Sequence, residues 1–213
     1  MKGLLIKEWY SLAGMRNFKA TLLFAIGTLG FAFLDGMSGI LLMLPMIAAM
    51  LPRAVLACDE NSKWQQLSLA LPYSRKDIVS SKYILALMLG FGSALAISIF
   101  YTIANLCKGG FDPNDLTFMF FAGLAVGLLI PSVATPIELK YGTENGKVFT
   151  MIWGGLLGCS GGLLVNIAGK DGIAKLAGSG SIAYLPLIAA AAALVIFSVS
   201  WAISIKVFEK REF

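Results

Sequence analysis

The sequence has no histidine and few charged residues. Of its 213 residues, 14% are Asp, Glu, Lys or Arg, and three are cysteines. Without histidine, neither a Ser-His-Asp triad nor a zinc site with histidine ligands can form. Cys58, Cys107 and Cys159 are odd in number and widely spaced, which argues against a disulfide framework and a metal knuckle. These absences remove several hydrolase and metalloenzyme classes.

Apolar residues dominate the chain instead. They make up 58% of it, and the mean hydropathy is +0.80, far from the values of a soluble domain. A transmembrane helix needs about 20 mostly apolar residues. We therefore predict a single all-α, polytopic membrane domain with six transmembrane helices, at about residues 20–34, 37–57, 83–106, 116–136, 148–168 and 184–205. The first span is short and the second contains Arg53, so a re-entrant hairpin is the alternative for this pair.

The first 17 residues predict a separate helix. Apolar residues lie on one side of it at helical spacing, namely Leu5, Ile6, Trp9, Leu12 and Ala13. This pattern indicates an amphipathic helix in the membrane interface. The alternative is a long helical lead into the first span.

The distribution of positive charge predicts the orientation. Of the 17 Lys and Arg residues, all but Lys108, Lys170 and Lys175 fall on one side of the membrane if the six spans alternate. Positively charged residues favour the cytoplasmic side, so both termini are expected inside. The net charge of +5 is then a signal of topology, and no basic patch suggests binding to nucleic acid.

Prolines and glycines mark several positions within the spans. Pro45 and Pro52 each remove a helix hydrogen bond, which predicts kinks in the second span. The fourth span is expected to start after an N-cap at Asp115 and to close around Pro131 and Pro136.

Glycine rows favour close helix packing. The fourth span carries Gly123 and Gly127, and the fifth carries Gly154, Gly158 and Gly162, each four residues apart. The row in the fifth span suits packing inside one subunit, a subunit interface or a pathway wall. Arg53 is interpreted as an anchor that reaches the headgroups, with a substrate or gating role as the alternative.

Residues 58–82 form the longest polar interruption. Asn61 can cap a short helix from Ser62 that Pro72 ends. Trp64, Leu67 and Leu71 share one face of this helix. Ser74 and Asp77 predict a capping box at the start of the next helix. From the pattern alone, a helix lying on the lipid surface is an equal alternative to one that binds a partner.

A second polar segment, residues 137–147, includes a sequence that resembles a phosphate-binding loop. Gly142-Thr-Glu-Asn-Gly-Lys147 has one residue too few between its glycines, and Val148 replaces the required Ser or Thr. We therefore expect no nucleotide site in this chain. Apart from Arg53, the span cores hold no charged residue, which argues against an ion-coupled carrier and an intramembrane enzyme.

Two patterns then resemble a known family. One is Lys63-Trp64-x-x-Leu67-x-x-x-Leu71-Pro72-x-Ser74-Arg75-x-x-Ile78-Val79-x-Ser81-Lys82-Tyr83, and the other is Pro136-x-x-x-Lys140-Tyr141-Gly142-x-Glu144-x-Gly146-Lys147. Both are similar to cytoplasmic segments of small six-span permeases of the type-2 ABC exporter family.

The resemblance implies a permease subunit in a bacterial cytoplasmic membrane. It would bind no cofactor itself, and a separate ABC ATP-binding subunit would hold ATP and Mg²⁺. Two permease chains, as a homodimer, would pair with two ATPase chains. The implied contacts with the ATPase are Lys63, Trp64, Leu67, Leu71, Pro72, Ser74, Arg75, Glu138, Lys140, Tyr141, Gly142 and Glu144.

The resemblance also suggests a cargo. The chain is similar to permeases that export amphipathic peptides such as phenol-soluble modulins. The alternatives are a lipid or drug exporter of the same architecture, and a membrane sensor or scaffold subunit that transports nothing.

Overall fold

The computed structural model describes residues 2–15, 18–35, 41, 43–64, 67, 74–108, 113–144, 146, 148, 152 and 185–210. Within these residues the chain is helical and contains no strand. The long helices are α1 (Lys2–Gly14), α2 (Phe18–Asp35), α3 (Met43–Asn61), α5 (Arg75–Lys108), α6 (Pro113–Tyr141) and α8 (Leu185–Glu209). The prediction of an all-α chain is confirmed for this part of the protein.

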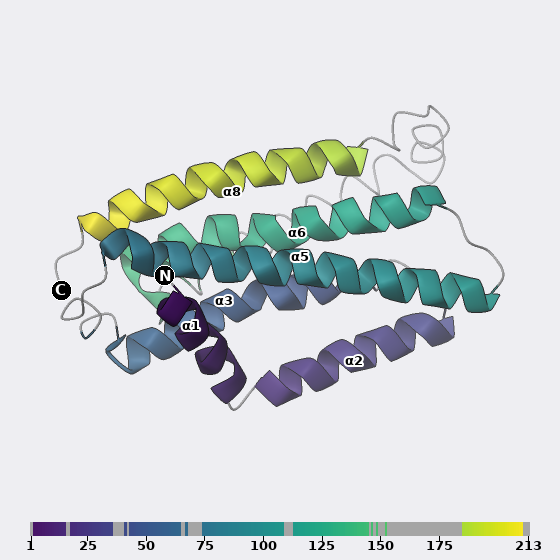
Figure 1. Cartoon of the computed structure of the whole chain (residues 1–213), viewed down its shortest axis with the longest axis horizontal. Helices are drawn as coiled ribbons and strands as arrows, with labels where there is room; N and C mark the ends of the chain where they lie inside the picture. Colours follow the sequence, from purple (N-terminus) through teal and green to yellow (C-terminus); the bar gives the residue numbers. More distant parts are fainter. Residues whose placement is uncertain are drawn as a thin grey trace.

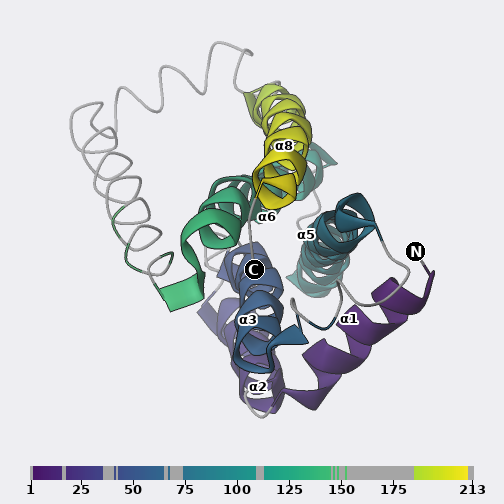
Figure 2. The ribbon, with the colours of Figure 1, turned by 90° about the vertical axis from the view of Figure 1, so that its left-hand side faces the viewer.

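The helices form a bundle around α6. This helix packs against α3, α5 and α8, and α5 also contacts α3 and α8. Viewed along the bundle, α6 lies between α8 and α3 (Figure 2). The helix α1 crosses the bundle obliquely near the end where both termini lie, and α2 runs along the outside (Figure 1).

Three of the described helices are long and apolar enough to cross a membrane. They span Arg75–Cys107, Leu116–Tyr141 and Pro186–Glu209. They contain the predicted third and fourth spans and all but the first two residues of the sixth. At about 1.5 Å per residue, the 34-residue helix α5 is about 50 Å long. The hydrocarbon core is about 30 Å thick, so α5 extends well beyond it.

The predicted first two spans correspond to α2 and α3, which run in opposite directions and are offset along the bundle (Figure 1). They have 18 and 19 residues, or about 27 and 28 Å of helix, close to the hydrocarbon thickness. The predicted fifth span, 148–168, lies almost wholly outside the described residues, so the number of six spans stays a prediction.

Glycines bring α5 and α6 into close contact. A Cβ atom built on Gly127 would lie 3.2 Å from the Cα of Gly90, and one built on Gly123 would lie 3.3 Å from the side chain of Ile97. The glycine pair predicted in the fourth span therefore packs against α5 within the same chain. Pro45 of α3 lies against the same two glycines.

A stripe of small and aromatic residues holds α8 to the bundle. Its buried residues recur every three or four positions: Pro186, Ala190, Ala193, Phe197, Ser200, Ser204 and Phe208. The Tyr83 hydroxyl of α5 forms hydrogen bonds of 2.8 and 2.7 Å with the Ser200 and Ser204 hydroxyls. The Tyr83 ring also packs edge-on against Phe197 at 5.1 Å between centroids.

The same stripe satisfies a carbonyl that a proline leaves free. Pro136 has no amide proton, so the carbonyl oxygen of Ser132, four residues earlier, lacks its helix donor. The Ser200 hydroxyl of α8 donates to that oxygen. Because lipid offers no donor, such a carbonyl must be satisfied by the protein.

Several sequence-based boundaries were wrong. The helix α6 continues through Pro131 and Pro136 to Tyr141, and at Pro136 the Ser200 hydroxyl of α8 replaces the missing donor. Pro45 lies in the first turn of α3, where the amide has no helix partner in any case, so Pro52 is the proline inside that helix. Asp115 lies inside the first turn of α6, which begins at Pro113, a favoured first residue.

The close contact between α5 and α6 gives the first prediction. Replacing Gly127 by Leu should separate the two helices and lower stability by about 1–3 kcal/mol, as overpacking does. Gly92 is the matched control, since a Cβ there meets nothing within 4 Å, and Gly92→Leu should leave stability unchanged. Thermal unfolding in detergent measures both. Equal melting temperatures for the two variants would contradict the close crossing.

Candidate functional site at the charged end of the bundle

One end of the bundle gathers charged side chains from several helices. It comprises α1, the end of α3, the start of α5 and the ends of α6 and α8, and we call it the charged end (Figure 1). Both polar segments singled out in the sequence leave the bundle here. The site is built from the contacts that fix these helix ends.

Four charged side chains form a buried cluster where α1, α3 and α5 meet. The Lys82 ammonium donates to Glu8 at 2.8 Å and to Asp59, and Lys7 forms a second ion pair with Asp59. Glu8, Asp59 and Lys82 are 1%, 3% and 5% exposed. Two positive and two negative charges cancel, as burial of ionised groups requires. This ionic cluster (Lys7, Glu8, Asp59 and Lys82) fixes three helices at one point.

The ionic cluster reaches the first polar segment through Lys7. Its ammonium lies 4.8 Å from the ring centroid of Trp64, in cation–π contact. The chain arrives there by a sharp turn after α3, in which Lys63 takes a left-handed conformation with φ of 55°. Such a residue commonly ends a helix. Asn61 lies in the last turn of α3, so the predicted cap at Asn61 was wrong.

The second polar segment leaves α6 through a similar turn. Gly142 has φ of 84°, and its amide donates to the carbonyl of Glu138 at 2.9 Å. The Glu60 carboxylate of α3 then accepts from the Thr143 amide at 2.7 Å and from the Thr143 hydroxyl at 2.6 Å. A Cβ on residue 142 would lie 2.8 Å from the same carboxylate, so glycine is needed for both reasons.

A further ion pair joins α3 to α6 below this turn. The Arg53 side chain donates from Nε to the Glu138 carboxylate. Glu138 is 2% exposed, so this residue, predicted to face an ATPase, lies inside the chain. Arg53 was interpreted as reaching the headgroups, and it instead points to α6. A buried carboxylate gives it a better partner than the membrane surface.

The remaining predicted site residues lie around the start of α5 and the end of α6. Ser74 and Asp77 form the expected capping box, with the Asp77 amide donating to the Ser74 hydroxyl at 3.1 Å and the Ser74 amide to Asp77 at 3.3 Å. Arg75 donates to the backbone carbonyl of Glu209 at 2.7 Å, tying α8 to α5. Leu67 and Tyr141 are each 58% exposed.

Of the other predicted residues, Lys140 and Glu144 are exposed, and Lys140 lies over the ring of Tyr141 at 4.9 Å. Five lie outside the described residues: Leu71, Pro72, Gly154, Gly158 and Gly162.

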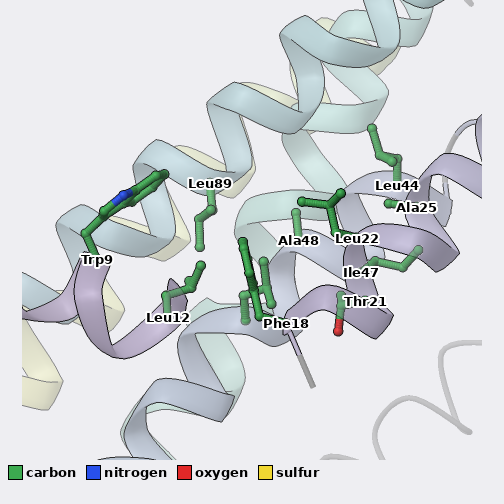
Figure 3. Close-up of a pocket in the computed structure, with 11 residues that line it drawn as sticks. Trp9, Leu12, Phe18, Thr21, Leu22, Ala25, Leu44, Ile47, Ala48 and Leu89 are labelled. Atoms are coloured by element: carbon green, nitrogen blue, oxygen red, sulfur yellow. The ribbon is translucent and has the colours of Figure 1, made fainter. Parts of the chain in front are cut away.

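An apolar cavity of about 200 Å³ opens beside the ionic cluster. It lies between α1, α2, α3 and α5, and Leu12, Phe18 and Leu89 point into it from three of them (Figure 3). Among the side chains that line the cavity, those of Thr21 and Trp9 carry polar atoms. The cavity suits an apolar chain or side chain.

Sequence reasoning missed the ionic cluster. The predicted apolar side of α1 included Ile6 and Trp9, which are 58% and 54% exposed, whereas the buried stripe is Leu4, Glu8 and Leu12. A signal existed, because Glu8 falls at helical spacing between two leucines. Its buried partner, Lys82, comes from a distant helix, so the local pattern could not identify Glu8 as buried.

The comparisons with known proteins give one match. A family model described as "ABC-2 family transporter protein" matches residues 3–209. Neither the curated proteins nor the solved structures contain a match. The match covers both polar segments and, apart from Lys2, all the long helices that the structure describes.

The ionic cluster gives the second prediction. Lys82→Met should leave two buried carboxylates with only Lys7, and the loss of one buried partner typically costs about 3–5 kcal/mol. The control is Lys76→Met, because Lys76 is exposed and lies 3.9 Å from Glu209, and exposed pairs contribute little. The yield of monodisperse protein and its melting temperature report the difference. A Lys82→Met variant as stable as the control would show that the charges are not buried together.

Proposed function

The chain belongs to the ABC-2 transporter family, a family of multi-pass membrane proteins, and on this premise we propose that it is the permease subunit of an ATP-driven exporter. The observation that carries the proposal is the family match across residues 3–209. Members of this family generally supply the membrane pathway and work with a separate ATP-binding subunit. ATP and Mg²⁺ would therefore be bound and consumed in a partner chain.

The partner ATPase would bind at the charged end. The exposed side chains of Leu67 and Tyr141 lie in the two polar segments, and each segment follows a helix that is tightly fixed by buried charges. Trp64 is half-buried, with Lys7 over its ring, so its position is set before any partner arrives. A preorganised aromatic residue among exposed apolar and polar neighbours is typical of a protein-binding surface.

The distribution of charge supports a cytoplasmic location for this end in a bacterial plasma membrane. Lys and Arg favour the cytoplasmic flanks of transmembrane helices, and the charged end carries Lys7, Lys63, Arg75, Lys76 and Lys140. Both termini lie at the same end (Figure 1). An even number of spans, six on our proposal, would place both inside.

Two permease chains would build one pathway. A pathway through the bilayer is enclosed by helices on all sides, and closed symmetric dimers are the commonest way for one chain to achieve this. We propose a homodimer with two ATPase chains. The glycine row Gly154, Gly158 and Gly162 is a candidate for the contact between the two permeases.

The proposed cargo is an amphipathic molecule, with peptides preferred. The apolar cavity beside α1 opens near the charged end and is lined by aliphatic and aromatic side chains with few polar atoms. Such a lining can accept the apolar face of a helix without selecting a particular sequence. A lipid or drug exporter of the same architecture is the second candidate, since an acyl chain also fits an apolar cavity.

The proposed orientation can be tested with the native thiols. Cys58 lies in the last turn of α3 at the charged end, Cys107 lies in the last turn of α5 at the opposite end, and both are exposed. In a Cys159→Ser background, an impermeant thiol reagent added to intact cells should label Cys107 and spare Cys58. Cys58→Ser and Cys107→Ser variants identify the labelled residue, and permeabilised cells provide the control in which both react. Labelling of Cys58 in intact cells would reverse the proposed orientation.

The function is tested through Trp64. Removing a buried aromatic side chain from an interface often costs about 2 kcal/mol, or about thirtyfold in affinity. Trp64→Ala should therefore leave the chain folded and inserted, reduce co-purification of the ATPase by about this factor, and abolish ATP-dependent uptake of a fluorescent amphipathic peptide into inside-out vesicles. Uptake of a fluorescent lipid instead of the peptide would favour the second candidate.

Two controls make this test specific. Trp64→Phe keeps a ring beneath Lys7 and should retain most of the binding, whereas Tyr10→Ala removes an aromatic side chain from α1 that is 72% exposed and should change neither readout. Unchanged binding and uptake in Trp64→Ala would place this residue on the lipid surface and remove the proposed ATPase contact.

A further inference from the structure

The end of α3 holds both polar segments at once. Asp59 and Glu60 are consecutive, so their side chains leave the helix about 100° apart. Asp59 bonds Lys7 and Lys82 on the side of α1 and α5. Glu60 bonds Thr143 on the side of α6.

Each side of α3 connects to one segment by an unbroken series of contacts. On the first side, Asp59 contacts Lys7, and Lys7 lies over Trp64. On the second side, Glu60 accepts two hydrogen bonds from Thr143, directly after the turn at Gly142. About two turns before Glu60 in α3, Arg53 pairs with Glu138, which lies four residues before the turn at Gly142.

The ion pairs among these contacts resist separation because at least one partner of each is buried. The contacts of Lys7 with Trp64 and of Glu60 with Thr143 are half-buried. Asp59, Lys82 and Glu138 are each 5% exposed or less. Pulling one partner away would leave an ionised group without water or counter-charge, which costs far more than breaking an exposed pair. When either segment is displaced, it therefore costs less for α3 to move with it as a whole than for these contacts to break.

We propose that residues 53–61 of α3 are the link that makes the two polar segments move together and passes their movement to α1, with Asp59 and Lys82 as positioning residues. The inference rests on the proposed function, since the movement would come from the ATPase closing on ATP. The ionic cluster transmits the movement because α1 is fixed to α3 through Asp59, Lys7 and Glu8. A displaced α1 would change the apolar cavity, which Leu12 of α1 lines together with three other helices.

The experiment follows α1 directly. Tyr10→Cys, in a background with Cys58, Cys107 and Cys159 replaced by Ser, is labelled with a bimane fluorophore at an exposed position of α1. The complex with its co-purifying ATPase is placed in lipid nanodiscs, and the bimane emission is recorded with and without ATP plus vanadate. We expect a nucleotide-dependent emission shift in this parent protein.

The decisive variant removes the link and keeps the charge balance. Asp59→Asn combined with Lys82→Gln removes one charge of each sign and leaves Lys7 beside Glu8, which lie 3.5 Å apart. We expect this variant to bind the ATPase and to lose the emission shift. Lys76→Met, which alters an exposed pair on the neighbouring turn of α5, should retain it.

A second variant tests the inference if the variant with Asp59→Asn and Lys82→Gln does not fold. Exchanging all four charges of the ionic cluster, with Lys7→Glu, Glu8→Lys, Asp59→Lys and Lys82→Glu, keeps every pair opposite in sign, so the emission shift should return.

A persistent shift in the neutral variant, or no shift in the exchanged variant despite ATPase binding, would overturn the inference, as would a parent complex that shows no shift. Failure of the proposed function is recognised separately, because no ATPase would then co-purify with the parent chain.

Discussion

The contact between Asp59 and Lys82 is the constraint on which the charged end depends. Both side chains are buried, and burial of opposite charges is favourable only when they are paired. Their helices are separated in the sequence by a polar segment. Once they pair, α3 and α5 must meet at this depth, and Glu8 and Lys7 bring α1 to the same point. These ion pairs hold α1 against α3 and α5.

A related constraint applies to the rest of the bundle, because the surrounding lipid offers no hydrogen-bond partners. The carbonyl of Ser132 that Pro136 leaves free receives the Ser200 hydroxyl, and many hydroxyls bond to carbonyls of their own helix. Ser98 and Ser198, for example, each bond the carbonyl four residues earlier. In lipid every polar group must be satisfied inside the protein. Small residues serve this requirement, because they let neighbouring helices approach closely enough to share donors.

These two constraints explain what the sequence could and could not predict. The capping box at Ser74 and Asp77 was predictable, since both residues belong to one turn. The apolar stretches of α5, α6 and α8 were equally visible, because length and composition suffice to identify them. Helix ends were harder. The helix α6 extends five residues past the expected stop at Pro136, where a hydroxyl from α8 compensates for the missing amide proton.

The directions of charged side chains were not predictable from local patterns. Arg53 near a helix end suggested an anchor at the membrane surface, and Glu138 suggested a contact with a partner. The two residues pair with each other across 85 positions of sequence. A charged residue faces the core only where another helix places an opposite charge beside it. The sequence of a single helix does not show where that partner lies.

The contrast between the two parts of the chain bears on how an exporter of this kind would select what it binds. The charged end is held by ion pairs and hydrogen bonds within the chain. On the proposed function, they would present a preorganised surface to the ATPase. The apolar cavity offers shape and hydrophobic surface with few polar atoms, which discriminates weakly between amphipathic molecules. The surface for the partner would therefore be preorganised, and cargo choice would be broad. Such a division allows one permease to remove many related amphipathic molecules while responding to the ATP cycle of a single enzyme.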